Sequence, residues 1–255
     1  MERNRGGIQH LITTKNKHMI QRKHFIQLSS LLVIFIIGGM QSCISQTKKG
    51  DFVKIFDGKT LTGWDADPAF WRVEDGAIVG QVVEGKPIKT NTFCMWKGGQ
   101  PSDFEFKTEY RISPEGNSGV QYRSEELKDI RYALKGYQAD IDGANTYTGQ
   151  NYEERGRGFL AMRGQSVVLK ANEKPTVVRS LGSSDSLKAL IKDGWNELRI
   201  VVKGNKMQHY INGVLMSEAV DEDAANSKSS GVLGMQVHVM PKMKVEYRNI
   251  YIKML

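Results

Sequence analysis

The sequence predicts an all-β fold, either a sandwich of two sheets or a jelly roll. From residue 51 onward, apolar and polar side chains alternate over short runs, which is the period of a strand with one buried face. The 26 glycines against 6 prolines, and turn sequences such as Asn212-Gly213 between the runs, indicate many tight hairpins. About ten such runs fit a sandwich better than a fold built around helices.

Residues 104–112 give the clearest strand, since Phe104, Phe106 and Tyr110 alternate with charged side chains. Similar strands are predicted, in chain order, at residues 71–73, 77–82, 119–123, 137–141, 159–162, 166–169, 195–203, 206–211, 231–238 and 244–253. Residues 124–131 and 183–192 are expected to form short helices. No Pro/Ser-rich linker interrupts residues 51–255, so we expect a single jelly-roll domain there.

Residues 1–42 have the features of a secretory signal peptide. Four basic side chains between residues 15 and 23 precede an apolar run at residues 31–37, which is too short to span a bilayer. Cys43 follows this run, as in a bacterial lipoprotein box, although Met40 and Gln41 depart from the usual pattern. We therefore expect lipidation at Cys43 and a tether over residues 43–50. A signal peptide without lipidation and a single anchor helix are the alternatives. The basic region before the apolar run is long, so Met19 is a second candidate for the start of translation.

The charge pattern argues against a nucleic-acid partner. The formal charge is +8, but residues 1–42 carry six basic side chains and one acid, so the remainder is only +3. Two cysteines cannot form a disulfide scaffold, and the sequence contains no CxxC motif or Cys/His cluster for a zinc site. Cys94 is expected to be a small buried side chain. Ile44 is not the Asp of inner-membrane retention, so we expect an outer-membrane lipoprotein facing the periplasm, with the lipid as its only membrane contact.

A set of motifs along the mature chain resembles one known family. The motifs are residues 56–64, 71–76, 103–106, 116–120, 136–140, 195–196 and 247–250, and residues 152–160 look like one branch of it. The family was once described only as a domain of unknown function (DUF1080) and is now described as 3-keto-disaccharide hydrolase. The resemblance covers nearly the whole mature chain. It implies a concanavalin A-like jelly-roll sandwich of two antiparallel sheets and an oligosaccharide or glycoside as substrate.

Strand alternation assigns the side chains that could contact a sugar. If Phe104 and Phe106 face the core, then Glu105, Glu109 and Arg111 face outward. The same rule turns outward the polar side chains Gln121, Arg123, Gln138, Asp140, Gln236 and His238. A Gly-rich segment that reads as a loop adds Glu153, Arg155 and Arg157 as groups that could hold a polar ligand. Solvated strand faces and loops are the structural alternative for all of them.

The chemistry that the resemblance implies begins with a ketone at C3, which makes the C2 proton acidic. A base removes this proton, the enolate expels the C1 substituent, and water then adds to the glycal. We expect His238 as base or acid because its ordinary pKa is near neutrality, with Asp140 or Glu109 orienting it or exchanging roles with it. Arg123, or else Arg111 or Arg163, would stabilise the enolate oxygen. Gln138, Glu153, Arg157 and Gln236 complete the expected substrate contacts.

Three further classes of function stay open. A glycosidase with two carboxylates cannot use Glu105 and Glu109, since four residues of strand separate them by about 13 Å; a cross-strand pair of Glu109 with Asp140 is still possible. A lectin-like binding module would need exposed aromatic side chains, and a structural lipoprotein would need no ionisable pocket. No cofactor is expected. A divalent cation held by Glu109, Asp140 and His238 is chemically reasonable, but the spacing contains no metal motif.

Overall fold

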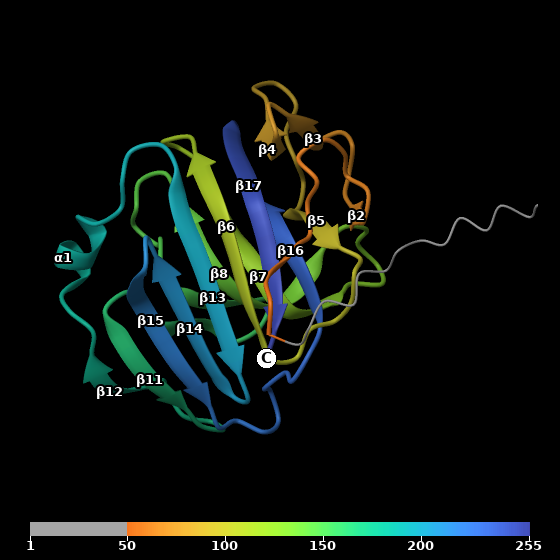
Figure 1. The fold of residues 1–255 in the computed structure, drawn as a ribbon. Helices are drawn as coiled ribbons and strands as arrows, with labels where there is room; N and C mark the ends of the chain where they lie inside the picture. The colour runs from red at the N-terminus through yellow and green to blue at the C-terminus, as the bar shows by residue number, and fades with distance from the viewer. Residues whose placement is uncertain (1–49) are drawn as a thin grey trace, which may run out of the picture. The chain divides into compact units, whose positions relative to one another are not determined.

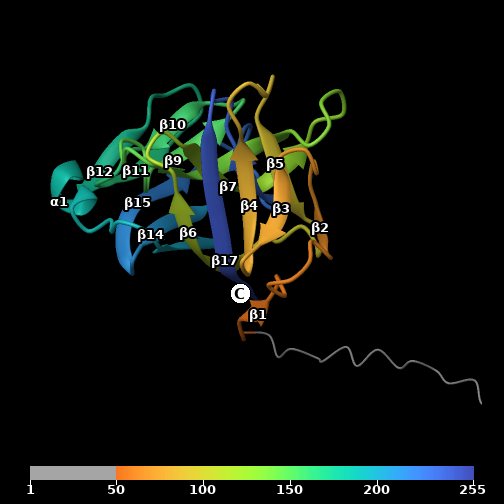
Figure 2. The same cartoon turned by 90° about the horizontal axis from the view of Figure 1, so that it is seen from above.

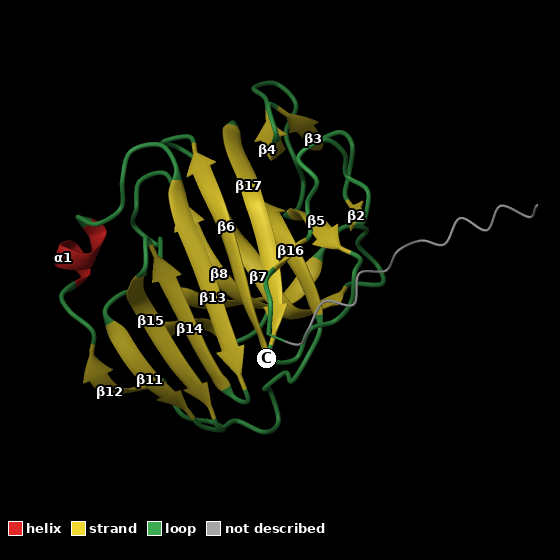
Figure 3. Ribbon diagram, in the orientation of Figure 1, coloured by secondary structure: helices red, strands yellow, loops and turns green. Residues whose placement is uncertain are grey.

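The computed structural model describes residues 50–255, which fold into two stacked β-sheets (Figures 1 and 2). Cys43 and the predicted signal peptide lie outside the described residues. Nearly all regular structure is strand, with one short helix among the described residues, α1 (Ser184–Lys188) (Figure 3). The prediction of an all-β jelly-roll sandwich is therefore confirmed. No helix within residues 50–255 is long and apolar enough to cross a membrane.

One layer is a ten-stranded sheet in the order β12-β11-β15-β14-β13-β6-β17-β4-β3, with β1 paired to β17. Its strands are β1 (Val53–Lys54), β3 (Trp71–Glu74), β4 (Ala77–Val82), β6 (Phe104–Ile112), β11 (Gln165–Leu169), β12 (Thr176–Ser180), β13 (Asn196–Lys203), β14 (Lys206–Ile211), β15 (Val214–Asp221) and β17 (Met243–Met254). All neighbours in it are antiparallel except β11 and β15, which run parallel.

The other layer is a seven-stranded sheet in the order β10-β9-β8-β7-β16-β5-β2. Its strands are β2 (Trp64–Asp65), β5 (Thr92–Trp96), β7 (Asn117–Glu126), β8 (Leu134–Asp142), β9 (Asn151–Glu154), β10 (Gly158–Ala161) and β16 (Val232–Val237). All of its strand pairs are antiparallel. The central strands β7, β8 and β16 present the surface on which the polar side chains gather.

The core forms where the inner faces of the two sheets meet. Phe104 and Phe106 of β6 are fully buried, as the alternation of this strand predicts. The Phe104 ring packs edge-on against Tyr122 of β7 at 6.1 Å between centroids, and Tyr122 stacks on Tyr137 of β8 at 5.7 Å. Because the inward residues of β6 and β8 both belong to this core, their polar alternates lie on opposite outer faces of the sandwich.

Two local predictions are wrong. The expected helix at residues 124–131 does not form: residues 124–126 end β7, where Glu125 and Glu126 pair with Lys135 and Leu134, and residues 127–131 lie in the turn that leads to β8. The segment around Glu153, predicted as a loop, is strand β9. The helix expected at residues 183–192 is present but short, and Ser183 caps it by accepting a hydrogen bond from the Ser186 amide.

Candidate functional site

A cavity of about 210 Å³ opens on the outer face of the seven-stranded sheet, and we call it the outer-face cavity. Strands β7, β8, β9 and β10, the loop after β8 and the end of β16 supply its walls. Its lining combines ionisable, amide and aromatic side chains: Asn117, Gln138, Asp140, Tyr147, Tyr152, Glu154, Phe159 and His238. Three residues predicted from the sequence, Gln138, Asp140 and His238, are therefore brought together.

Asp140 lies at the base of this cavity and is only 6% exposed. The pKa of its carboxyl is raised from 3.8 to about 8, mainly by burial; a hydrogen bond from Gln138 opposes the shift, and the neighbouring Asp142 and Glu154 carboxylates add to it. The Gln138 amide donates that bond to Asp140 Oδ1 at 2.8 Å. At neutral pH Asp140 is thus mostly a neutral acid that can donate a proton.

His238 follows the last residue of β16 and is half-buried at the cavity wall. Its Nδ1 lies 3.0 Å from the Val239 carbonyl oxygen. Because a carbonyl oxygen only accepts, this contact puts the ring proton on Nδ1 and leaves the lone pair on Nε2. The imidazole can therefore take a proton while Asp140 gives one.

A chain of amide hydrogen bonds connects the polar groups across the strands. Gln138 Nε2, which donates to Asp140, also lies 3.5 Å from Gln236 Oε1, and Gln121 donates to Gln138 Oε1 at 3.2 Å. Gln236 in turn donates to Glu154 Oε2 at 3.4 Å. These glutamines are almost fully buried, so they hold the acids in place more than they offer surface for a ligand.

Gly119 makes room for this arrangement. It pairs with Asp140 across β7 and β8, and a Cβ on Gly119 would lie 2.6 Å from Gln138 Cγ. Any side chain at residue 119 would therefore displace Gln138 from Asp140.

Aromatic side chains form the outer wall of the cavity. Phe159 and Tyr147 are 44% and 39% exposed, and their rings stack with centroids 5.8 Å apart. Tyr152 meets Phe159 edge-on at 5.1 Å. Exposed rings beside buried polar groups are typical of sites that bind sugars or other amphipathic ligands.

Glu109 and Arg111 are not part of this site. They lie on β6 of the ten-stranded sheet, on the opposite outer face of the sandwich. Arg248 donates to Glu109 Oε2 at 2.6 Å, and Arg111 donates to both oxygens of Glu246. The predicted pair of Glu109 and Asp140 is therefore not formed, because the two residues lie on opposite faces of the sandwich. Strand alternation predicted which side chains point outward, but it does not say which sheet a strand joins.

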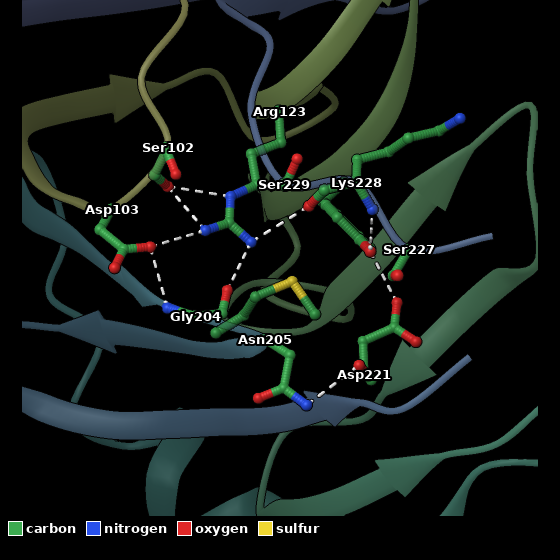
Figure 4. A pocket seen from close by; sticks show the side chains of 11 residues that line it. Ser102, Asp103, Arg123, Gly204, Asn205, Asp221, Ser227, Lys228 and Ser229 are labelled. Atoms are coloured by element: carbon green, nitrogen blue, oxygen red, sulfur yellow. Dashed lines mark hydrogen bonds and ion pairs between the residues drawn. The ribbon is translucent and has the colours of Figure 1, made fainter. Parts of the chain in front are cut away.

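Arg123 does not lie on the outer face of the sheet, where alternation placed it. A bulge after Tyr122 breaks the alternation of β7, and Arg123 adopts a positive φ of 47°. Its buried guanidinium lines a second cavity of about 340 Å³, the end cavity, formed by loops at one end of the sandwich (Figure 4). All five of its N–H donors are used: they reach the carbonyl oxygens of Ser102, Gly204 and Lys228 and the Asp103 carboxylate.

The end cavity offers paired charges only, apart from Lys228. Asp221, on its wall, accepts a bidentate pair from Arg157 at 3.1 and 2.6 Å and a hydrogen bond from Tyr137. The Nε of Arg157 also donates a hydrogen bond to the Glu153 carboxylate at 2.6 Å. Glu153 and Arg157 were predicted to contact substrate, but in the structure they pair with each other. The end cavity is larger than the outer-face cavity, but its carboxylates and its arginine are already paired within the protein and are not free to act on a ligand.

Arg163 holds a loop beside the outer-face cavity. It is 6% exposed and donates to the carbonyl oxygens of Asn145 and Thr148, on either side of Tyr147. Among residues 50–255, no arginine lines the outer-face cavity, so none of the described arginines is the expected partner for an enolate oxygen there. The neutral Asn117 amide and Tyr152 hydroxyl are the donors that the lining provides in its place.

Sequence reasoning missed five lining residues: Asn117, Tyr147, Tyr152, Glu154 and Phe159. Had residues 151–154 been read as a strand, alternation would have turned Tyr152 and Glu154 outward and Glu153 inward.

Within residues 50–255, no group of three or more His, Cys, Asp or Glu side chains could hold a metal ion. The trio of Glu109, Asp140 and His238 is not assembled, because Glu109 lies on the other sheet. Cys94 is fully buried in the core, as expected from the sequence, and this burial raises the pKa of its thiol.

Comparison with solved structures defines the class of fold. Two proposed glycosyl hydrolases from Parabacteroides distasonis share the fold, each with a TM-score of 0.52. The first is 21% identical over 81% of this chain and 94% of its own. The second is 18% identical over 80% of this chain and 100% of its own. A Bacillus subtilis protein of unknown function with a galectin-like fold aligns at a TM-score of 0.51 and 12% identity, over 76% of this chain and 90% of that chain.

The family follows from the sequence match. Residues 51–253 match the 3-keto-alpha-glucoside-1,2-lyase-like domain, and the chain belongs to that family. A relative from Bacteroides thetaiotaomicron named 3-keto-disaccharide hydrolase is 32% identical over 87 residues. That alignment spans 30% of this chain and 28% of the relative.

Proposed function

We propose that this chain cleaves 3-keto-glycosides in the outer-face cavity by elimination across C1 and C2, followed by hydration. One observation carries the proposal: the buried Asp140 carboxyl, whose pKa burial raises, shares a cavity with His238, whose Nδ1 lies against a backbone carbonyl oxygen so that Nε2 is the nitrogen that can accept a proton. The family and the name of the Bacteroides relative support it.

In the proposed reaction, His238 Nε2 takes the proton from C2, which the C3 ketone has made acidic. The electron pair of the C–H bond first forms the C2–C3 double bond of an enolate, with the negative charge on the C3 oxygen. The enolate then returns to the ketone as the C1–C2 double bond forms and the C1–O bond breaks, and Asp140 gives its proton to the leaving oxygen. The neutral donors Asn117 and Tyr152 stabilise the enolate oxygen at C3. Water then adds at C1 while C2 regains a proton, so the net reaction is hydrolysis.

The ketone makes the proposal testable, because no side chain of the cavity can remove the C2 proton of an ordinary glycoside. The protein is incubated with a 3-keto-glucoside and with its unoxidised parent, each with and without a chelator. We expect release of the aglycone from the keto substrate alone, in both conditions. Release from the parent would contradict the elimination mechanism and would favour a two-carboxylate hydrolase that uses Asp140 and Glu154, the two acids of the cavity.

A binding module without catalysis is the second candidate, and the exposed aromatic wall of Tyr147 and Phe159 favours it. It predicts that both the keto and the parent sugar bind and that neither is cleaved. The same incubations, read together with calorimetric titration of each sugar, separate the two functions.

We also propose that the protein is exported and anchored in the outer membrane, facing the periplasm, by a lipid on Cys43. The basic and apolar segments before Cys43 support this. Metabolic labelling with a radioactive fatty acid should mark the wild-type protein and not Cys43→Ala. Label that persists in Cys43→Ala would contradict the anchor.

A further inference from the structure

We propose that Tyr147, Tyr152 and Phe159 form a stacking surface, the aromatic wall, for the leaving group of the substrate, so that the protein selects glycosides whose leaving group has a flat apolar face. This inference rests on the proposed function and names its substrate class. Such a face can be an aromatic ring or the C–H face of a second sugar. Both offer a surface that an aromatic side chain can cover.

The depth of the groups decides which part of the substrate meets the aromatic wall. Asp140 and Gln138 are 6% and 3% exposed, whereas Tyr147 and Phe159 are 39% and 44% exposed. The sugar that reacts must reach the buried acid at the base. Its leaving group then lies at the mouth of the cavity, beside the exposed rings.

The volume agrees with this division. The outer-face cavity holds about 210 Å³, less than the range of about 300 to 1,000 Å³ that encloses a whole small ligand. The base can therefore enclose only part of a glycoside, and the remainder must rest on the outer surface.

The spacing of the rings shows how a ligand would be held. The Tyr147 and Phe159 centroids are 5.8 Å apart with 20° between the planes. A ring placed between them would need about 3.5 Å on each side, which this gap does not provide. A leaving group would therefore stack on the exposed side of the pair.

The loop that carries Tyr147 is fixed before any ligand arrives. The Asp142 carboxylate accepts hydrogen bonds from the backbone amides of Thr146, Tyr147 and Thr148 at 2.8 to 2.9 Å. Arg163 donates to carbonyl oxygens on both sides of Tyr147.

The hairpin that carries Phe159 is tied in the same way. Glu153 accepts from the Arg157 backbone amide at 3.0 Å and from its side chain at 2.6 Å. A surface held in this way loses little conformational freedom on binding. Arg157 and Arg163 thus act on the substrate through the aromatic wall and not by direct contact.

Charge narrows the substrate class further. The part of the chain that the structure describes gives the lining the acids Asp140 and Glu154 and no lysine or arginine. A leaving group that carries a carboxylate would meet the Glu154 carboxylate with no lysine or arginine of the lining to offset the repulsion. We therefore expect a leaving group without a negative charge.

The test compares leaving groups in variants of the full-length protein. The substrates are the 3-keto derivatives of nitrophenyl glucoside, of a glucose disaccharide and of methyl glucoside, whose methyl group cannot stack. Phe159→Ala and Tyr147→Ala should each raise KM roughly three- to tenfold for the aryl or the disaccharide substrate and leave methyl glucoside unchanged. Phe159→Tyr keeps the ring and should keep the wild-type KM. Met162→Ala, an equally exposed apolar side chain outside the lining, is the matched control.

Each outcome bears on the inference. An increase confined to the aryl substrate assigns an aromatic leaving group, and an increase confined to the disaccharide assigns a sugar. An equal change for all three substrates, methyl glucoside included, or no change for any, would overturn the aromatic wall as a leaving-group site.

If the wild-type protein cleaves none of these substrates, the proposed function fails, and titration with unoxidised nitrophenyl glucoside still tests the wall. Binding that weakens in Phe159→Ala and not in Met162→Ala supports it. Absence of binding overturns it.

Discussion

Asp140 and His238 line the same outer-face cavity, and replacing either tests its role in proton transfer. Asp140→Asn and His238→Ala should each lower turnover of a 3-keto-glucoside by roughly 10² to 10⁴, with the fold intact by circular dichroism. Glu109→Gln removes a carboxylate on the opposite face of the sandwich and should leave turnover nearly unchanged. A loss of activity in Glu109→Gln matching that of Asp140→Asn would contradict this placement of the site.

The buried Asp140 carboxyl also makes stability depend on pH. Its pKa is about 8 in the folded protein against 3.8 for the free group, so between these values the folded state holds one proton more than the unfolded state. The free energy of unfolding therefore falls as pH rises through this interval. Asn cannot ionise, so the stability gained by Asp140→Asn should be near zero at about pH 4 and reach a few kcal/mol by about pH 8.

Urea denaturation of both proteins across this interval measures the difference. A gain in stability that stays constant with pH would show that Asp140 is ionised throughout, and the assignment of a proton-donating acid would be wrong.

At the scale of the strands, Gly119 on β7 controls the position of Gln138 on β8. In Gly119→Ala the new methyl group would come within 2.6 Å of Gln138 Cγ, and Gln138 would have to leave Asp140. We expect turnover to fall about tenfold, the effect of one lost hydrogen bond to the acid, while the core stays folded. Kinetics at saturating substrate measure this. Unchanged turnover would mean that the amide network does not position Asp140.

Strand β6 shows what alternation predicts well, and β7 shows where it fails. Every second residue of β6 enters the core, because an unbroken strand keeps its period of two. In β7 the bulge after Tyr122 turns Arg123 into the loops, where backbone carbonyls and the Asp103 carboxylate take all of its donors. A bulge depends on the partner strand, so the sequence of β7 alone does not reveal it.

Strand β9 was missed for a related reason. Its sequence is polar and flanked by glycines, which predicts a loop, but pairing with β8 makes it a strand. Alternation within β9 then turns Tyr152 and Glu154 into the cavity and Glu153 toward Arg157.

At the scale of the whole molecule, the two sheets separate residues that the sequence grouped together. Charged side chains on β6 and on β8 look equivalent by alternation, yet the topology places them on opposite faces. The sheet to which a strand belongs is set by long-range pairing, which local patterns do not encode. The all-β class, by contrast, follows from local periodicity and was predicted from it.

Isotope incorporation tests the central claim, elimination through C2 in the outer-face cavity, most directly. The protein is incubated with a 3-keto-glucoside in deuterated water, and the released sugar is analysed by mass spectrometry and NMR before the product can exchange by itself, with a control that lacks protein. The account predicts one deuterium at C2, because that carbon regains its proton from solvent when water adds to the glycal. Release of a sugar that carries no deuterium at C2 would contradict it.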